Sequence, residues 1–208
     1  MSFLNKFNSL VDHQYSKPKG VLGWLIGEKM IRQHKSETLW TLENLNLQKD
    51  ERILEIGCGA GYALKIISNE YRDIKITGLD LSKTLLHSAR IRNNRSLRQK
   101  RMKIVYGSVE RLPFNDEQFS TVFSIHSIYF WENLSKALRE IHRVLKPGGT
   151  VHLTLCNGKN EEIWDTINSL VNIQALPIMK QLNFTNVRLL RGPVSRGYHT
   201  IAIIGDKE

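Results

Sequence analysis

The chain has 208 residues and a mass of 24.0 kDa, enough for one domain that buries a complete core without disulfides or metal ions. Its net charge of +10 is compatible with nucleic-acid binding. Whether the charge indicates such binding depends on where the basic residues lie in the fold. No apolar run is long enough to cross a bilayer, the start is polar, and only two cysteines occur. These features favour a cytoplasmic protein without disulfides.

The pattern of residues 1–48 predicts a helical extension that precedes the first strand. Helical spacing predicts helices at 3–11, 21–33 and 36–47, the last with Ser36 as its N-cap. The apolar residues of 21–31 share one broad face, which has to be buried. The extension is therefore expected either to close over a pocket as a lid or to cover the sheet edge, ahead of a main domain at 49–208. Three aromatic or imidazole side chains in it are weak site candidates, His13, Tyr15 and Trp24.

The next segment predicts a strand, a tight turn and a helix. An apolar run at 52–56 gives way to Gly57, Gly59 and Gly61, and helical periodicity resumes over 61–70. Glycines at such positions allow positive φ and close approach of the backbone to a ligand. The spacing is G-x-G-x-G rather than the G-x-G-x-x-G of dinucleotide loops. Asp80 ends the following strand, 74–79, where a carboxylate can accept hydrogen bonds from ribose hydroxyls. A small polar cofactor is implied.

The rest of the chain continues to alternate strands with helices, as expected for a doubly wound parallel sheet. The link at 191–197 is rich in turn residues and favours an antiparallel hairpin between the last two strands. The remaining expected elements are a helix at 82–94, strands at 103–106 and 119–125, a helix at 133–145, a strand at 150–156, a helix at 160–172, and strands near 186–191 and 199–204.

Over about residues 45–156 the chain resembles the class I S-adenosylmethionine-dependent methyltransferases, in the motif style of the quinone-biosynthesis branch. Glu55, the three glycines and Asp80 carry this resemblance, together with Gly-Ser-Val-Glu-Arg-Leu-Pro-Phe at 107–114 and Leu-Lys-Pro-Gly-Gly at 145–149. The resemblance implies a Rossmann-like α/β sheet of seven strands with the last strand antiparallel. Ser108 stands where the family has an acid, and a hydroxyl accepts a hydrogen bond from an adenine amine more weakly than a carboxylate does.

The resemblance also implies S-adenosyl-L-methionine as the cofactor. In the family the acid at the end of the first strand, here Glu55, orients the loop and the methionine amine. No C-x-x-C motif or Cys/His cluster is present, so no metal site is predicted. The residues expected to bind the cofactor are Glu55, Gly57, Cys58, Gly59, Gly61, Asp80, Leu81, Ser108, Val109 and Ile125.

The segment 123–131 is expected where the methyl group and the substrate meet. It lacks the Asn/Asp-Pro-Pro-Tyr/Phe motif with which nucleic-acid amine methyltransferases grip a planar base. His126 is the side chain there that titrates near neutral pH, so it is the candidate general base. Its alternative is a packed, hydrogen-bonding residue. Tyr129 and Trp131 are expected either to face the sulfonium or an aromatic substrate, or to pack in the core.

The basic residues concentrate at 90–103, with no acid among them. A helix that leaves the ligand end of a parallel sheet carries 95–103 to the opposite end, which favours a solvated surface. We therefore expect a methyltransferase acting on an oxygen, nitrogen or carbon of a small metabolite. The alternatives are an RNA methyltransferase guided by the basic segment and a non-catalytic S-adenosylmethionine-binding protein. The sequence predicts no oligomeric state.

Overall fold

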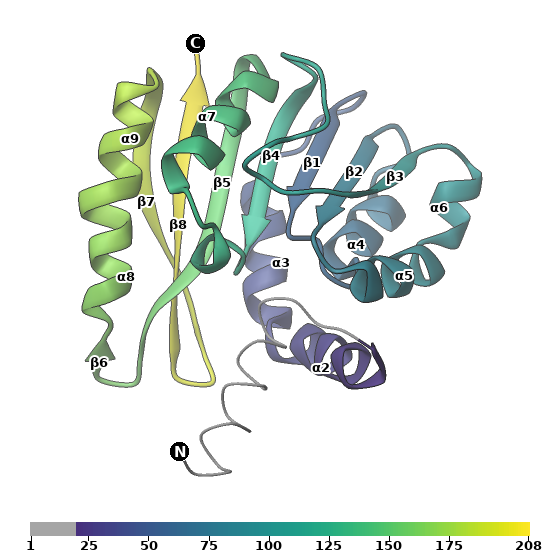
Figure 1. Cartoon of the computed structure of the whole chain (residues 1–208), viewed down its shortest axis with the longest axis horizontal. Coiled ribbons are helices and arrows are strands. Elements are labelled where there is room, and N and C mark those ends of the chain that lie inside the picture. Colours follow the sequence, from purple (N-terminus) through teal and green to yellow (C-terminus); the bar gives the residue numbers. More distant parts are fainter. Residues whose placement is uncertain (1–19) are drawn as a thin grey trace.

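The computed structural model describes residues 20–208, and side chains from residue 27 onward. The helix expected at 3–11, His13, Tyr15 and the side chain of Trp24 lie outside the described part. One mixed sheet forms the centre of the molecule, in the order β3-β2-β1-β4-β5-β8-β7, with the short β6 paired to β5 (Figure 1). Among residues 20–208, no helix combines the length and apolar character needed to cross a bilayer.

The first five strands run parallel, whereas β8 runs antiparallel to both β5 and β7. This arrangement confirms the doubly wound, Rossmann-like sheet with an antiparallel last strand. The two-residue β6 is an addition to the seven expected strands. The strands are β1 (Arg52–Ile56), β2 (Lys75–Asp80), β3 (Met102–Tyr106), β4 (Phe119–Ile125), β5 (Leu145–Lys159), β6 (Glu162–Ile163), β7 (Phe184–Ser195) and β8 (Tyr198–Lys207).

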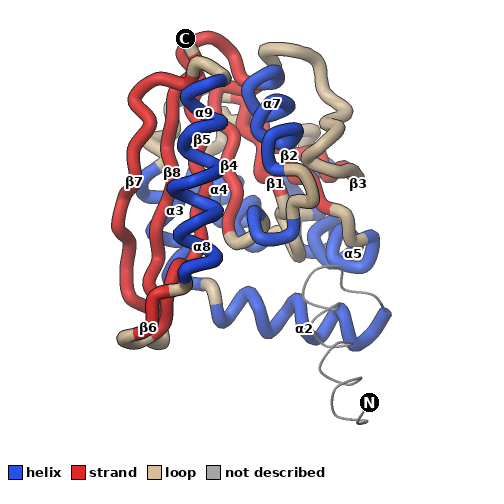
Figure 2. The backbone as a smooth tube through the Cα atoms, turned by 60° about the vertical axis from the view of Figure 1, so that its left-hand side comes forward, coloured by secondary structure: helices blue, strands red, loops and turns tan. Residues whose placement is uncertain are grey.

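Helices cover both faces of the sheet, as parallel strands require. Helices α7, α8 and α9 lie on one face, and α3, α4 and α5 lie on the other (Figures 1 and 2). Each layer closes a separate cluster of buried apolar side chains against the sheet. The helical elements are α2 (Gly20–Gln33), α3 (Lys35–Asn44), α4 (Tyr62–Glu70), α5 (Lys83–Arg92), α6 (Asn94–Arg98), η1 (Ile128–Phe130), α7 (Leu134–Val144), α8 (Asp165–Ser169), η2 (Leu170–Ala175) and α9 (Leu176–Gln181).

Three predicted helices have different bounds in the structure. The helix expected at 160–172 starts only at Asp165, because β5 continues to Lys159 and turns back through β6. The helix expected over 82–94 divides at Asn93, whose buried side chain donates to the carbonyl oxygens of Ala89 and Gly61. The third difference is at α3, where His34 rather than Ser36 occupies the N-cap position.

The two described helices of the extension have different surroundings. Helix α3 packs against β4, β5 and β7, and Thr41 Oγ1 lies 2.8 Å from Thr154 Oγ1 of β5. Helix α2 crosses the edge of the sheet at the carboxyl ends of the parallel strands (Figure 2). Arg92 of α5 holds α2 there, because its guanidinium contacts both carboxylate oxygens of Glu28, at 2.6 and 2.8 Å, and donates to the Ala60 carbonyl.

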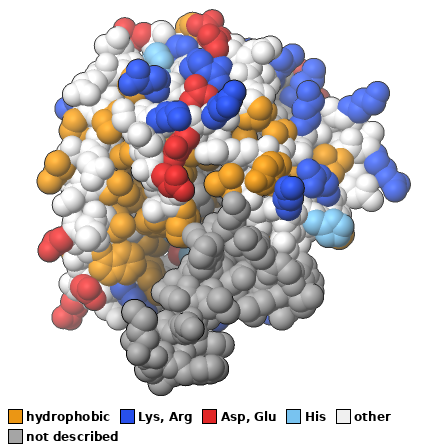
Figure 3. Space-filling model, viewed as in Figure 1, with side chains coloured by type: hydrophobic (Ala, Val, Ile, Leu, Met, Phe, Trp, Pro, Cys, Tyr) orange, Lys and Arg blue, Asp and Glu red, His pale blue; other side chains and the backbone are white. Residues whose placement is uncertain are grey.

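The basic segment spans the edge of the sheet beside β3: Arg92 lies at the carboxyl ends of the parallel strands, and Arg101 lies at the opposite end. Arg101 precedes β3 and donates to the carbonyl oxygens of Ser68 and Tyr71 at the end of α4. Arg95, Arg98 and Lys100 are exposed. Lysine and arginine side chains line this edge of the surface, near α5 and α6 (Figure 3). Arg92 and Arg101 thus have structural partners, which leaves a smaller free basic surface than the composition indicates.

Replacing Arg92 with Gln should release α2 from the glycine loop. The Arg92–Glu28 pair is partly exposed, so we expect the free energy of unfolding to fall by only about 1 kcal/mol. Limited proteolysis should cleave α2 faster than in the unchanged protein. Exposed Lys29→Gln on the same helix is the control, and equal cleavage of both variants would show that the ion pair does not hold α2.

Candidate functional site

The candidate site is a cavity at the carboxyl ends of β1, β2 and β4. Its floor is formed by the glycine loop after β1 and by the end of β2, and its far wall by the residues after β4. Helix α2 and the start of α3 close it from the side of the extension. Parallel α/β sheets bind ligands at this edge, where the loops after neighbouring strands meet.

Two glycines of the loop are required for different reasons. Gly57 has a φ of +72°, and a Cβ there would lie 2.4 Å from Ser127 Cβ, so only glycine fits beneath the segment after β4. Gly59 has a φ of +52° and borders the cavity, and a Cβ there would meet no atom closer than Leu85 Cδ1 at 3.9 Å. A larger side chain at 59 would therefore enter the ligand space.

Asp80 joins the two loops that form the floor. Its Oδ2 accepts from the Gly59 amide at 2.8 Å, and its Oδ1 accepts from the Ser82 amide at 2.7 Å. Burial raises the pKa of this carboxyl, and the backbone donors at Ser82, Gly59 and Leu81 oppose that shift. Three backbone donors leave at least one of the four lone pairs, so the carboxylate can still accept from a ribose hydroxyl.

Glu55 contributes a second carboxyl to the cavity wall. It is 4% exposed, and its Oε2 has no hydrogen-bond partner. Burial, together with the smaller effect of the charge of nearby Asp80, raises the pKa of Glu55 to about 8. Without a ligand the group is therefore mostly protonated at neutral pH. An ammonium group bound beside it would favour the ionised form and pair with the orphaned oxygen.

The other residues expected at the cofactor divide into two groups. Gly61 and Ser108 do not line the cavity. Gly61 instead packs on Ala89 and Asn93, and the Ser108 hydroxyl accepts from the Glu110 amide at 3.2 Å. The expected residues that do line the cavity are Glu55, Gly57, Cys58, Gly59, Asp80, Leu81, Val109 and Ile125.

Sequence reasoning missed several wall residues because they come from other parts of the chain. Gly27, Met30 and Ile31 of α2 line the cavity, as does Thr38 of α3. The broad apolar face of 21–31 was the available signal. Gly78 of β2 was also missed, and it leaves room for the Cys58 thiol, because a Cβ at 78 would lie 2.9 Å from Cys58 Sγ.

His126 lies at the substrate end, directly after β4, with a φ of +56° that is uncommon for a residue other than glycine. Its Nδ1 lies 3.3 Å from the Tyr129 hydroxyl, which also contacts the backbone of Cys156. Burial, together with the smaller effects of the charges of His34 and Arg196, lowers the pKa of His126 to about 3. The ring is therefore neutral at neutral pH.

The two aromatic candidates after β4 have different surroundings. Tyr129 is held by Cys156 and does not line the cavity. Trp131 lines the cavity, and its indole N–H donates to Ser127 Oγ at 3.2 Å.

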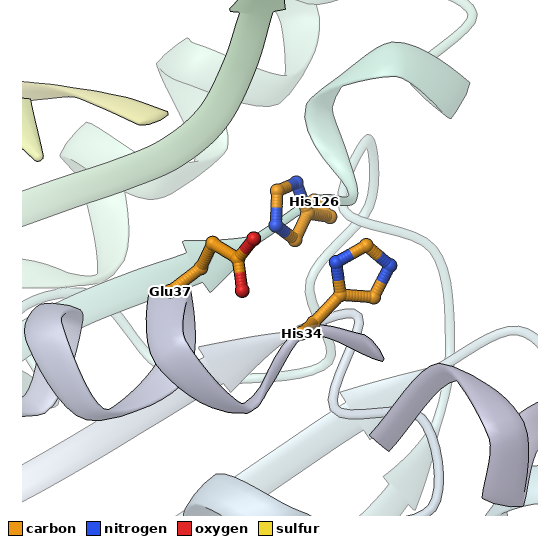
Figure 4. A group of neighbouring side chains, drawn as sticks. All are labelled: His34, Glu37 and His126. Atoms are coloured by element: carbon orange, nitrogen blue, oxygen red, sulfur yellow. The ribbon is translucent and has the colours of Figure 1, made fainter. Parts of the chain in front are cut away.

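His126 is also part of a group that the sequence does not reveal. His34 and Glu37, from the start of α3, point toward His126 (Figure 4). One donor atom from each residue lies within 4.8 Å of the other two. The ring centroids of His34 and His126 are 4.2 Å apart. The H-x-x-E spacing of His34 and Glu37 was the local signal, but the third member comes from a strand end 89 residues later.

Comparison with known proteins bears directly on this site. Residues 54–153, which include the glycine loop, Asp80 and His126, match the sequence profile of the methyltransferase domain family. The chain contains a class I methyltransferase domain. This confirms the resemblance inferred from the motifs.

Individual relatives of this methyltransferase are distant. It is 28% identical over 131 residues to the uncharacterized methyltransferase YdaC of Bacillus subtilis, covering 63% of this chain and 70% of that one. It is 33% identical over 99 residues to a fatty-acid O-methyltransferase of Mycolicibacterium smegmatis, covering 48% and 35%. The fold matches phosphoethanolamine N-methyltransferase 2 of Haemonchus contortus, with a TM-score of 0.72 at 17% identity over 89% of this chain and 56% of that one.

The residues of this methyltransferase fit S-adenosylmethionine, the cofactor of its class. Gly59 offers a backbone that a ligand can approach closely, and Asp80 offers acceptors for ribose hydroxyls. The orphaned oxygen of Glu55 offers a partner for the methionine ammonium. Three separate features of the ligand thus meet complementary groups along one cavity.

Replacing Asp80 with Ala should weaken S-adenosylmethionine binding by roughly 2–3 kcal/mol, because a charge-assisted contact to the ribose is lost. Asp80→Asn retains one acceptor oxygen and should bind with intermediate affinity. Calorimetric titration measures both variants, with exposed Asp73→Ala as the control. Unchanged affinity in Asp80→Ala would place the ribose elsewhere.

Glu55 should make the unliganded protein less stable as the pH rises. Between about pH 4.5 and 8 the unfolded chain has lost the proton that the folded chain retains, so the free energy of unfolding falls with pH. The slope from this group is at most about 1.4 kcal/mol per pH unit. Denaturant titrations of Glu55→Gln should lack this component, whereas exposed Glu70→Gln should keep it. An identical pH profile in Glu55→Gln and the unchanged protein would contradict the shifted pKa.

Proposed function

We propose that this protein transfers the methyl group of S-adenosylmethionine to an oxygen, nitrogen or carbon of a small metabolite. The observation that carries the proposal is the set of residues that lines the substrate end of the cavity. Beyond Glu55 and Asp80 the cavity ends among His34, His126, Phe130 and Trp131, under helix α2. A space bounded in this way by the chain's own helices suits a small molecule better than a polymer.

The relatives support the same substrate class. The Mycolicibacterium smegmatis relative is named as a fatty-acid O-methyltransferase, and a Caenorhabditis elegans relative as a sterol 4-C-methyltransferase. Both names describe small-molecule acceptors, although the chain spans only about a third of the length of each of these relatives.

Methyl transfer requires of the protein chiefly that it position the cofactor and the acceptor. The cofactor supplies an electrophilic methyl group on a positively charged sulfur. Asp80, Glu55 and the glycine loop would fix its orientation, while α2 and α3 would exclude water from the reacting atoms. Trp131 offers an aromatic wall at the substrate end, held by its bond to Ser127. A general-base role for His126 stays a prediction.

The basic surface offers weaker support for an RNA substrate. Arg95, Arg98 and Lys100 are exposed, but none of them lines the cavity, and the neighbouring Arg101 lies at the other end of the sheet. An RNA strand bound there would have to pass around the domain to reach the methyl group. We also propose a cytoplasmic location, supported by Cys58 and Cys156, which are both unpaired and buried.

The decisive assay supplies methyl-labelled S-adenosylmethionine together with either a metabolite extract or total RNA. We expect label in a small molecule, and we expect it to persist when Arg95, Arg98 and Lys100 are all changed to Gln. Arg101 is left intact because it bonds the end of α4. Gly59→Val, which fills the ligand space, is the inactive control.

Two results would contradict the proposal. Label in RNA that disappears in the triple variant, with a steep dependence on salt, would show an RNA methyltransferase. Cofactor binding without transfer to either pool would indicate a non-catalytic binding protein.

A further inference from the structure

The group formed by His34, Glu37 and His126 stands apart from the residues that fit the cofactor. His34 and Glu37 lie one helical turn apart at the start of α3, so both side chains project from the same side of that helix. His126 reaches them from the end of β4 (Figure 4). His34 and His126 line the substrate end of the cavity, and Glu37 lies directly behind them, fully buried.

The polar atoms of this group lack partners. Within the described part of the chain, seven buried side-chain nitrogen or oxygen atoms have no hydrogen-bond partner, and four of them belong to this group. The four atoms are His34 Nδ1, His126 Nε2 and both carboxylate oxygens of Glu37. An unpaired buried carboxylate is costly, and natural proteins pair it or bind a cation to it.

The contacts of Tyr129 allow the tautomer of His126 that carries its proton on Nδ1. The Tyr129 oxygen accepts from the Cys156 amide, and if the hydroxyl donates to the Cys156 carbonyl, at 3.2 Å, its other lone pair can accept from His126 Nδ1, at 3.3 Å. The proton then resides on Nδ1, and Nε2 presents a bare lone pair to Glu37 and His34. This is the tautomer that binds metal ions, with its other nitrogen held by a hydrogen bond.

Among the described residues, Arg196 is the counter-charge that approaches Glu37, but it does not satisfy the carboxylate. Its Nη2 lies 3.9 Å from Glu37 Oε1, beyond hydrogen-bond distance, and the arginine side chain is 42% exposed. The guanidinium also lies over the Tyr198 ring. Both oxygens of a fully buried carboxylate therefore face two imidazoles with no strong donor between them.

We propose that His34, Glu37 and His126 bind a divalent first-row transition-metal ion. Two imidazoles and one carboxylate form a ligand set that such ions accept, with coordination positions left over. Donor atoms about 2.1 Å from a tetrahedral ion lie about 3.4 Å apart. The three donors, now within 4.8 Å of one another, would have to approach by small side-chain rotations.

The remaining coordination positions would face the cavity, because the two histidines line it. Resting on the proposed function, we infer that a bound ion would hold an oxygen or nitrogen atom of the methyl acceptor at this end of the cavity. The acceptors favoured would then be those with a donor atom able to coordinate a metal.

The test is a titration of the metal-free full chain with Co²⁺, followed by visible absorption, and with Zn²⁺ in competition. We expect one ion per chain and a d–d spectrum typical of a low-coordinate site. His34→Ala, Glu37→Gln and His126→Ala should each weaken binding at least 100-fold, since even outer partners of a metal ligand contribute 10–100-fold. Tyr129→Phe, which removes the partner of Nδ1, should weaken it about 10–100-fold.

His152→Asn is the matched control, because His152 is buried on β5 and lines a separate cavity. The His152→Asn variant should bind the metal ion with the same affinity as the unchanged protein. Circular dichroism and S-adenosylmethionine titration of every variant separate loss of the site from loss of the fold. Absence of metal uptake by the folded protein, or equal uptake after the three ligand changes, would overturn the metal site.

The outcomes also separate this inference from the proposed function. Metal uptake without methyl transfer to any small molecule would leave the site standing and contradict the proposed activity. Methyl transfer by a folded protein that takes up no metal would contradict the metal site and leave the proposed activity standing.

Discussion

The hydrogen bonds of Asp80 are the constraint on which the site depends. The carboxylate accepts from Gly59 on one side and from Ser82 on the other, so it ties the loop after β1 to the start of α5. Such bonds are charge-assisted and form in a buried setting, where they are strong. They fix the backbone of the glycine loop in the position that leaves Gly59 open to the cavity. The cofactor-binding edge is thus preorganised by the residue that also offers acceptors to the ribose.

A second constraint comes from the helices that precede the domain. Arg92 links Glu28 of α2 to the carbonyl of Ala60, so one guanidinium joins the extension to the glycine loop. Helix α3 is held on the sheet by its apolar packing and by the Thr41–Thr154 contact. Together these contacts bring the start of α3 against the end of β4. The substrate end of the cavity exists because of this junction.

Two buried carboxyl groups determine which cations the cavity can bind. Glu55 and Glu37 are both enclosed, and each has carboxylate oxygens without a partner. A buried negative charge is tolerated where a cation completes it. At Glu55 the fitting cation is the ammonium of an amino-acid moiety. At Glu37 two imidazole nitrogens share the space, a combination that suits a metal ion better than an organic cation. The two ends of the cavity therefore differ in the chemistry they accept.

Local sequence determined much of this protein. The glycine loop, Asp80 and the alternation of strands and helices predicted the doubly wound sheet, because glycine conformation, hydrophobic period and strand-end position are properties of short segments. Element bounds failed where partners far along the chain decided them, as in the extension of β5 past residue 156 through its pairing with β8 and β6. Ser108 does not line the cavity, because its hydroxyl accepts from the Glu110 amide two residues away, a local contact that the motif does not reveal. The group of His34, Glu37 and His126 was decided by tertiary structure alone, because its members are separated by 89 residues and meet only when α3 packs across the end of β4.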